Sequence, residues 1–154
     1  MNGEEHPVVK LLVDKGLIEP SSERVKPNRR IYTFKPERIR EIISTMINNL
    51  GHDYFYISTV IGTDFPDKKL IRLDYYIVLL PGEETIILRT WLPRDNPVID
   101  SILDIYPGVL NAECETYDLL GVVFKGNPAL KRGFFVPSDL VEKNIYPLRK
   151  DSGV

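Results

Sequence analysis

Three acidic residues, Glu113, Glu115 and Asp118, form the densest group in the chain that could do chemistry. Closely spaced carboxylates can serve as general acid and base or bind a metal, and Glu115 and Asp118 are spaced to share a helix face. No histidine lies near them in the sequence, and acids at a helix start suit the helix dipole. We therefore predict structural roles for these residues and no catalytic site.

The chain carries few of the residues that bind metals or attack substrates. Its only histidines are His6 and His52, and its only cysteine is Cys114. A histidine-based triad or a zinc site needs more such groups close together, and one thiol cannot supply an iron-sulfur cluster. Gly121 and Gly126 lack the Gly-Lys-Ser/Thr ending of a phosphate loop. We expect no cofactor or metal in this chain, and an inert, apolar role for Cys114.

Length and composition indicate one folded domain. The 154 residues are 43% hydrophobic and 27% charged, as in globular proteins. A formal net charge of −2 gives no positive field for nucleic acid. Met1 to Lys10 lacks the regions of a signal peptide, and apolar runs such as Tyr75 to Leu80 are far below the ~20 residues of a membrane-spanning helix. Any membrane association is expected through partners, and the absence of Gln hints at a thermophile.

Two segments have the spacing of helices. Pro7 to Leu17 begins with proline and has Gly16 where a left-handed C-terminal cap belongs. From Pro36 to Leu50 apolar residues recur at helical spacing, and Gly51 ends the pattern. The residues of this stripe are Ile39, Ile42, Ile43, Met46, Ile47 and Leu50. Such a stripe must cover an apolar surface, which predicts a sheet beside it.

The predicted sheet consists of segments rich in aromatic and β-branched residues. They are Arg30 to Phe34, Tyr54 to Ile61, Leu70 to Leu80 and Thr85 to Leu92. Short turn segments join the last three, which therefore form an antiparallel meander. We interpret Glu19 to Arg30 as an exposed connector, and Val98 to Ile105 and Asn111 to Leu120 as short helices. The prediction is an α+β fold with a small, mostly antiparallel sheet of three to four strands packed with helices.

The chain after Leu120 is predicted to differ from the α+β domain of residues 1–120. Residues 121–154 contain repeated Gly and Pro, and only Pro137 to Lys143 can form a helical turn or two. Yet the segment keeps more apolar residues than a solvated tail would. We interpret it as an extended segment that docks on a partner subunit, where its basic residues pair with acids. The alternative is that it wraps back on its own domain.

Ordered motifs between Leu92 and Asp151 resemble a known family. They include Leu92-Pro93-Arg94-Asp95-Asn96-Pro97, Asp104-Ile105-Tyr106-Pro107, Glu113, Glu115, Tyr117-Asp118-Leu119, Gly126, Pro128 and Tyr146-Pro147-Leu148-Arg149-Lys150-Asp151. This series is similar to the 30 kDa subunit family of respiratory complex I (the C-type subunit of NADH:quinone oxidoreductase) and to the equivalent small subunit of energy-converting membrane-bound NiFe hydrogenases and related sulfur-reducing complexes. Departures at Cys114, Leu120, Asn127 and Ile145, with the shortness at both ends, favour the hydrogenase-type branch.

The resemblance implies a non-catalytic structural subunit of the peripheral redox module of a membrane-bound, ion-pumping oxidoreductase. It implies a hetero-oligomer with a NiFe-hydrogenase-like large subunit and a cluster-bearing small subunit, at the cytoplasmic side of the cell membrane. A NiFe centre and iron-sulfur clusters would lie only in partner subunits, and the same role in an NADH or other donor:quinone oxidoreductase stays open. The residues expected at partner contacts are Arg94, Asp95, Glu113, Glu115, Asp118, Phe124, Lys131, Arg132, Phe134, Phe135, Tyr146, Arg149, Lys150 and Asp151.

A different class of function also fits the predicted sheet. In the strand Leu70 to Leu80 one face carries Ile71, Leu73, Tyr75, Ile77 and Leu79, and the other begins with Arg72 and Asp74. On that second face, aromatic residues could line the pocket of a stand-alone enzyme or small-molecule-binding domain. They are Tyr54, Tyr56, Tyr76 and Trp91. A stable monomer with turnover or ligand affinity of its own would support this alternative.

Overall fold

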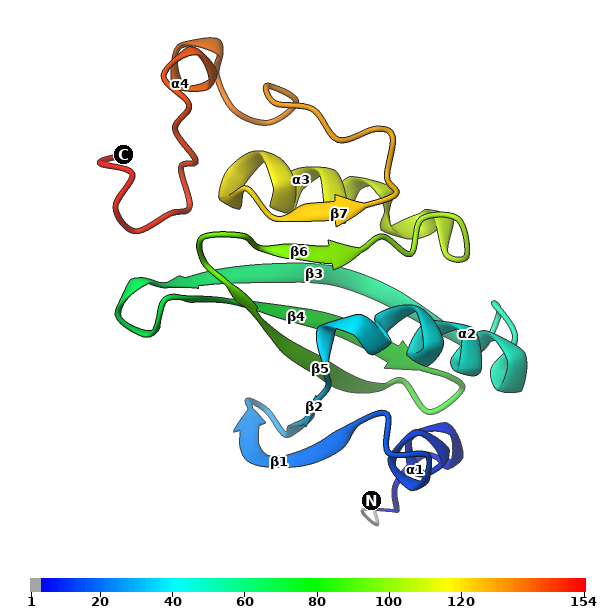
Figure 1. Ribbon diagram of the computed structural model, residues 1–154. Coiled ribbons are helices and arrows are strands. Elements are labelled where there is room, and N and C mark those ends of the chain that lie inside the picture. The colour runs from blue at the N-terminus through cyan, green and yellow to red at the C-terminus, as the bar shows by residue number, and fades with distance from the viewer. Residues whose placement is uncertain (1–3) are drawn as a thin grey trace.

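The computed structural model describes residues 4–154, in which helices cover a mixed β-sheet (Figure 1). The elements in chain order are α1 (Pro7–Asp14), β1 (Glu19–Val25), β2 (Arg29–Thr33), η1 (Pro36–Arg38), α2 (Ile39–Leu50), β3 (Phe55–Phe65), η2 (Pro66–Lys68), β4 (Leu70–Leu79), β5 (Glu84–Pro93), β6 (Val98–Asp100), η3 (Pro107–Val109), α3 (Leu110–Leu120), β7 (Val123–Lys125) and α4 (Ser138–Glu142). The main sheet is five-stranded, in the order β1-β2-β5-β4-β3, and β6 pairs with β7 in a small parallel sheet. The predicted α+β class is confirmed, with one more strand in the main sheet than the upper predicted number.

The central meander follows the predicted pattern. β3, β4 and β5 pair antiparallel, while β2 joins β5 in parallel because α2 carries the chain across the sheet between β2 and β3. α1 and α2 contact each other and pack on one face (Figure 1). The side chains of β4 on that face are fully buried in one core with Ile39, Ile42, Ile43 and Met46 of α2, and Ile47 and Leu50 pack against it partly buried. The helical stripe predicted from the sequence is therefore the one that covers the sheet.

Besides β7, which lies in the segment predicted to be extended, two segments adopt strands that the sequence did not predict. Glu19–Val25 was expected to be a connector, but it pairs with β2 as the outer strand β1, which satisfies backbone groups of the β2 edge. Val98–Asp100 was expected to begin a short helix and forms β6, paired with β7. Its β-branched residues Val98 and Ile99 suit a strand, and the local spacing contains no sign of the distant partner β7.

The last part of the chain begins inside the core. Val122 and Phe124 are buried with the sheet residues, and β7 is held by β6. Beyond β7 the chain runs irregularly over α3, and α4 is the predicted helical turn (Figure 1). Val122 and Phe124 thus pack with the core although they follow Leu120.

Close packing places α3 against β3. A Cβ at Gly62 in β3 would collide with the side chain of Leu120 and lie 3.3 Å from the Thr116 methyl group. Gly62 therefore leaves room for the Leu120 side chain between α3 and β3, and a larger residue there would displace it.

Candidate partner-binding surface

Asp118 on α3 holds the irregular segment that follows β7. Its side chain is fully buried and accepts hydrogen bonds from the backbone N–H groups of Gly133 at 2.9 Å, Phe135 at 2.7 Å and Val136 at 3.0 Å. Arg132 Nε donates to the same carboxylate at 3.0 Å. A buried charge needs such partners, and here four donors satisfy one carboxylate.

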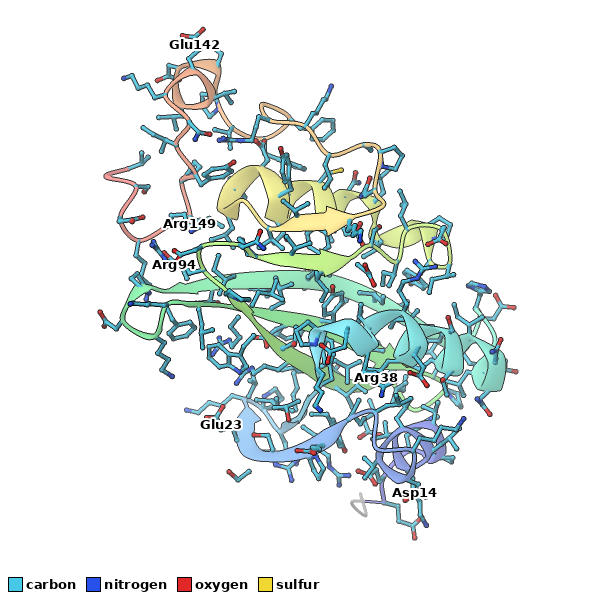
Figure 2. All side chains as sticks on the ribbon, in the orientation of Figure 1. Asp14, Glu23, Arg38, Arg94, Glu142 and Arg149 are labelled. Atoms are coloured by element: carbon cyan, nitrogen blue, oxygen red, sulfur yellow. The ribbon has the colours of Figure 1, made fainter. Side chains whose placement is uncertain are left out.

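Asp64 at the end of β3 holds the C-terminal residues. Its buried carboxylate accepts from Arg94 Nε at 2.7 Å, from Arg94 Nη2 at 2.9 Å and from the backbone N–H of Lys150 at 2.9 Å. Arg94 also pairs with Asp151 at 2.9 Å. Arg149 donates to the carbonyl oxygens of Leu120 at 2.6 Å and Arg94 at 3.2 Å. Figure 2 shows Arg94 and Arg149 side by side where the C-terminal segment returns to the body of the protein.

Glu113 is the third buried carboxylate of this region. It accepts from Ser101 Oγ at 2.6 Å, from the backbone N–H of Ile102 at 3.0 Å and from Asn127 Nδ2 at 2.8 Å. Ser101 and Ile102 follow β6, and Asn127 follows β7. Glu113 therefore joins α3 to the small parallel sheet.

The environments of two carboxylates favour their charged forms. The guanidinium of Arg94 lowers the pKa of Asp64 despite the burial of that side chain. Burial opposes ionisation of Asp118 most strongly, yet the backbone N–H groups and Arg132 together lower its pKa as well. Both groups are thus anions at neutral pH and bind the C-terminal segment by charge-assisted hydrogen bonds.

Tyr146 fits between two arginines beside the end of α3. The Arg132 guanidinium lies 3.9 Å from its ring centroid and that of Arg149 lies 5.9 Å away. Gly121, which caps α3 with φ of +81°, lies against this ring, and a Cβ there would come within 3.1 Å of it. Gly121 is therefore needed for both its backbone conformation and the space it leaves.

An exposed apolar surface lies on the outer side of these contacts. The Phe134 and Phe135 rings pack edge to face with centroids 4.8 Å apart and are 59% and 43% exposed. Leu110, 38% exposed, and Leu130 line the same hollow as Phe134, with Lys131 at the rim. We call Leu110, Leu130, Lys131, Phe134 and Phe135 the Phe134 surface.

The structure divides the predicted partner contacts into two groups. Glu113 and Asp118 are buried, Arg94, Arg132 and Arg149 bond within the chain, and Tyr146 is half-buried against Arg132 and Arg149. Phe124 is buried in the core at 1% exposure, which corrects the prediction of a partner contact for it. The exposed members, for which contact with a partner stays a prediction, are Asp95, Glu115, Lys131, Phe134, Phe135, Lys150 and Asp151.

Several residues of this region were not predicted from the sequence. Arg94, which was expected at a partner contact, binds Asp64 within the chain. Asp64 lies beyond the strand predicted over Tyr54 to Ile61. In the structure β3 extends to Phe65 and directs Asp64 to the buried side, to which Val60, four residues earlier, also points. In the sequence, the one sign that Asp64 is buried is its spacing of two and four residues from Gly62 and Val60, which places all three on one face of a strand.

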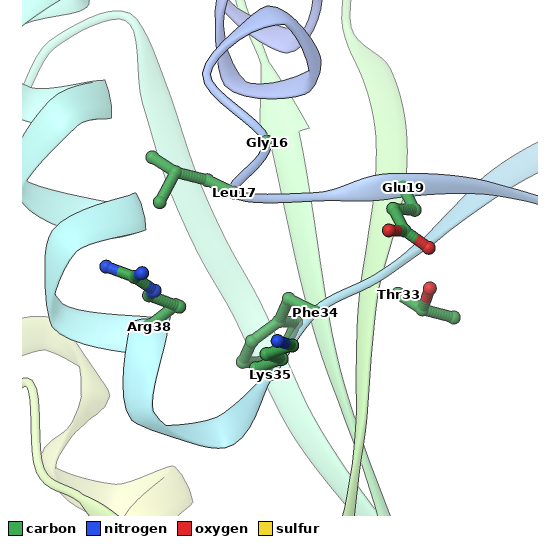
Figure 3. Close-up of a pocket in the computed structure, with 7 residues that line it drawn as sticks. All are labelled: Gly16, Leu17, Glu19, Thr33, Phe34, Lys35 and Arg38. Atoms are coloured by element: carbon green, nitrogen blue, oxygen red, sulfur yellow. The ribbon is translucent and has the colours of Figure 1, made fainter.

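A second hollow lies far from this region, between the end of α1 and η1 (Figure 3). Arg38 and Glu19 project from opposite sides of it in Figure 3, and Arg38 pairs with Glu41 at 2.8 Å. The charged side chains that line this hollow do not converge on a common point where they could bind a ligand together. The lining residues are Gly16, Leu17, Glu19, Thr33, Phe34, Lys35 and Arg38.

Within residues 4–154 no group of three or more His, Cys, Asp and Glu side chains is arranged to bind a metal ion. The same residues include no helix with the length and apolar character needed to cross a bilayer. Burial raises the pKa of the Cys114 thiol, and its sulfur lies 3.8 Å from the carbonyl oxygen of Ala129. The neutral thiol is the less reactive form.

Comparison with known proteins identifies the family. Residues 32–154 match the family described as "Respiratory-chain NADH dehydrogenase, 30 Kd subunit". The chain belongs to this family. The resemblance seen in the motifs from Leu92 to Asp151 is thereby confirmed, and the match extends it to most of the sheet.

Individual proteins with related sequences support this assignment to the 30 Kd subunit family. The C subunit of F(420)H(2) dehydrogenase from Methanosarcina mazei is 32% identical over 122 residues, which are 79% of this chain and 73% of that protein. The C subunit of NADH-quinone oxidoreductase from Moorella thermoacetica is 33% identical over 96 residues, 62% of either protein. The chain therefore spans less than two thirds of the second relative.

A solved structure shares the fold. A chain in the structure of "the membrane-bound sulfane sulfur reductase (MBS), an archaeal respiratory membrane complex" superposes with a TM-score of 0.76. The superposition covers 94% of this chain and 82% of that chain at 23% identity. With 94% of this chain covered, the shared fold includes most of residues 121–154.

Proposed function

We propose that this 30 Kd-type subunit is a non-catalytic structural component of the peripheral redox module of a membrane-bound, ion-pumping respiratory complex. Its relatives carry the names of subunits of oxidoreductases, and the chain that shares its fold comes from a respiratory membrane complex. These names support assembly with other chains. The role is to brace a larger subunit, since the described residues bring together no set of groups that could do chemistry.

The Phe134 surface is the observation that carries this role. Aromatic side chains dominate the binding energy of many interfaces, and exposed apolar groups on an ordered loop are typical of a binding site. Asp118 binds the backbone of Phe135 directly, so the loop is fixed before any partner arrives. A fixed loop loses less conformational entropy on binding than a mobile one.

The partner proposed for this surface is a NiFe-hydrogenase-like large subunit, with a cluster-bearing small subunit beside it. Lys131 at the rim suits an acidic residue of the large subunit. Any NiFe centre and iron-sulfur clusters would lie in those chains. The protein would be peripheral, on the cytoplasmic side of the membrane, and held there by its partners.

Among related complexes we propose the hydrogenase type and its sulfur-reducing relatives. The superposition on a chain of the sulfane sulfur reductase over 94% of this chain, together with the departures at Cys114, Leu120, Asn127 and Ile145, supports this branch. The equivalent role in an NADH or other donor:quinone oxidoreductase is the alternative, and the masses of the companion chains would distinguish the two.

Co-purification tests this function. A tagged full-length chain, produced in cells that make the native complex, is expected to isolate with a large subunit and a cluster-bearing subunit, both identified by mass spectrometry. The double variant Phe134→Ser/Phe135→Ser should lose them, because interface aromatics commonly contribute about 2 kcal/mol or more each.

Tyr54→Ser provides a matched control, since Tyr54 is 54% exposed and lies outside the Phe134 surface. Both variants should melt at the wild-type temperature, because neither alters a buried side chain. Companion chains retained by the double variant at wild-type yield would refute docking through this surface. A wild-type chain that isolates alone would refute the structural role itself.

A further inference from the structure

Positive side chains gather around two aromatic rings near the turn between β3 and β4. The rings of Phe65 and Trp91 lie with centroids 5.3 Å apart. Lys68 Nζ is 5.3 Å from the first centroid and 5.2 Å from the second, and the Arg72 guanidinium carbon is 5.2 Å and 5.9 Å from them. Lys150, from the other end of the chain, places Nζ 5.4 Å from the Phe65 centroid. We call these five residues the Trp91 patch.

The chain's own acids leave much of this charge unbalanced. Among residues 4–154 neither Lys68 nor Lys150 forms an ion pair with a carboxylate. Arg72 forms an ion pair with Asp74, Nε to Oδ2 at 3.2 Å without a hydrogen bond, and shares that carboxylate with Arg89, which binds it at 2.7 Å. The ring faces offset part of the repulsion between the cations, and an added anion would offset the rest.

The C-terminal contacts build the patch. The backbone N–H of Lys150 is bound to the buried carboxylate of Asp64, which Arg94 also holds. Lys150 is thereby fixed beside Phe65, the neighbour of Asp64 in β3. Three segments far apart in the sequence thus supply one preformed group of donors on an aromatic base.

We propose that the Trp91 patch is a binding site for a short acidic segment of a partner protein. Its carboxylates would accept hydrogen bonds from Arg72, Lys68 and Lys150, while its aliphatic parts lie on the rings. Exposed Asp67 and Asp151 stand next to Lys68 and Lys150 in the sequence. A broad polyanion such as an acidic bilayer would meet these like charges, whereas a narrow segment can place its acids between them.

This site goes beyond the proposed function, because docking through the Phe134 surface does not require it. Trp91 is the only tryptophan of the chain, so its fluorescence reports directly on the patch. The full chain is titrated with an octaglutamate peptide at low salt. The expected result is a saturable change in fluorescence that weakens strongly when NaCl is raised to about 0.5 M, where charges are screened.

Lys68→Glu is expected to weaken peptide binding by at least about fivefold, because it removes one attraction and adds one repulsion. Lys143→Glu makes the same change at an exposed lysine beside α4 and should bind as the wild type does. An octaglutamine peptide should leave the fluorescence unchanged.

Absence of a response to octaglutamate, an equal response to octaglutamine, or unaltered affinity of Lys68→Glu would overturn the proposal. Vesicles of phosphatidylglycerol test the other source of anions. Vesicle binding that depends on Lys68, with no peptide binding, would also overturn it by assigning the patch to a lipid surface. These outcomes concern the isolated chain and are separate from loss of the companion subunits in co-purification.

Discussion

In the sheet layer, α1 and α2 bury Val9, Leu12, Ile42 and Met46 against β4 and β5, and none of these side chains needs a specific partner. In the C-terminal region the irregular backbone is held in place by Asp64, Glu113 and Asp118, which accept hydrogen bonds from backbone N–H groups. The hydrophobic effect is non-directional and follows the buried area, whereas a buried carboxylate stabilises only in the company of its donors.

Buried carboxylates thus allow a segment without regular structure to present a fixed surface. Few periodic contacts are available after β7, so the chain is positioned at single points where a carboxylate binds backbone N–H groups. Such points are strong but cannot be replaced by other side chains of similar size. The two regions should therefore respond differently to substitution and to pH.

Asp118→Ala should have the largest effect. It leaves three backbone N–H groups and the Arg132 guanidinium without their acceptor, which should cost about 3–5 kcal/mol. Urea denaturation measures the loss, and hydrogen exchange should show the amides of Gly133, Phe135 and Val136 opening first. Glu115→Ala on the exposed side of α3 is the control, expected within about 0.5 kcal/mol of wild type. Equal effects of the two variants would contradict the role of Asp118.

Lowering the pH should unfold the C-terminal region before the sheet layer. The loss of stability should be smaller than in Asp118→Ala, because the protonated carboxyl group still fills its site. The folded pKa values of Asp64 and Asp118 lie below the ordinary 3.8. Their stabilisation is therefore complete above about pH 3.8 and is lost as the pH falls through the folded values. Cleavage by pepsin between pH 4 and 2 should begin after β7. Initial cleavage in the sheet layer would show that the C-terminal region is not the first part to open in acid.

Ile43→Val should act on the sheet layer alone. Ile43 is fully buried between α2 and the sheet, and removal of one methyl group should lower the free energy of unfolding by about 0.5–1.5 kcal/mol. Hydrogen exchange should show no preferential opening of the amides bound by Asp118. Selective opening of those amides would show that the two regions are not held independently.

Tyr75→Phe should have the smallest effect. Tyr75 is fully buried in β4, and its hydroxyl group has no hydrogen-bond partner among the described residues. Removing it should leave the melting temperature unchanged or slightly raised. Tyr106→Phe is the contrasting variant, because the Tyr106 oxygen accepts from the backbone N–H of Ile57 at 3.0 Å, and its loss should cost about 0.5–1.5 kcal/mol. A large loss of stability in Tyr75→Phe would reveal a polar role for that hydroxyl.

Features that depend on local spacing could be predicted from the residues alone. The stripe of α2, the meander from β3 to β5, the glycine caps at Gly16 and Gly51, and the family motifs after Leu92 all follow from residues near one another. Periodicity of 3.6 or 2 sets which side chains share a face, and burial of that face then follows. Phe134 and Phe135 are exposed, and their contact with a partner stays a prediction.

Which charged residues are buried as part of the fold and which are exposed depends on contacts between distant segments of the folded chain. Asp64 and Lys150 are 86 positions apart, and nothing in either neighbourhood marks them as partners. Glu115 and Asp118 carry the same chemistry on one helix, yet one is exposed and the other buried, because the segment from Gly133 to Val136 covers only Asp118. Desolvation and donor geometry depend on distant chain segments, and therefore arise only once the chain has folded.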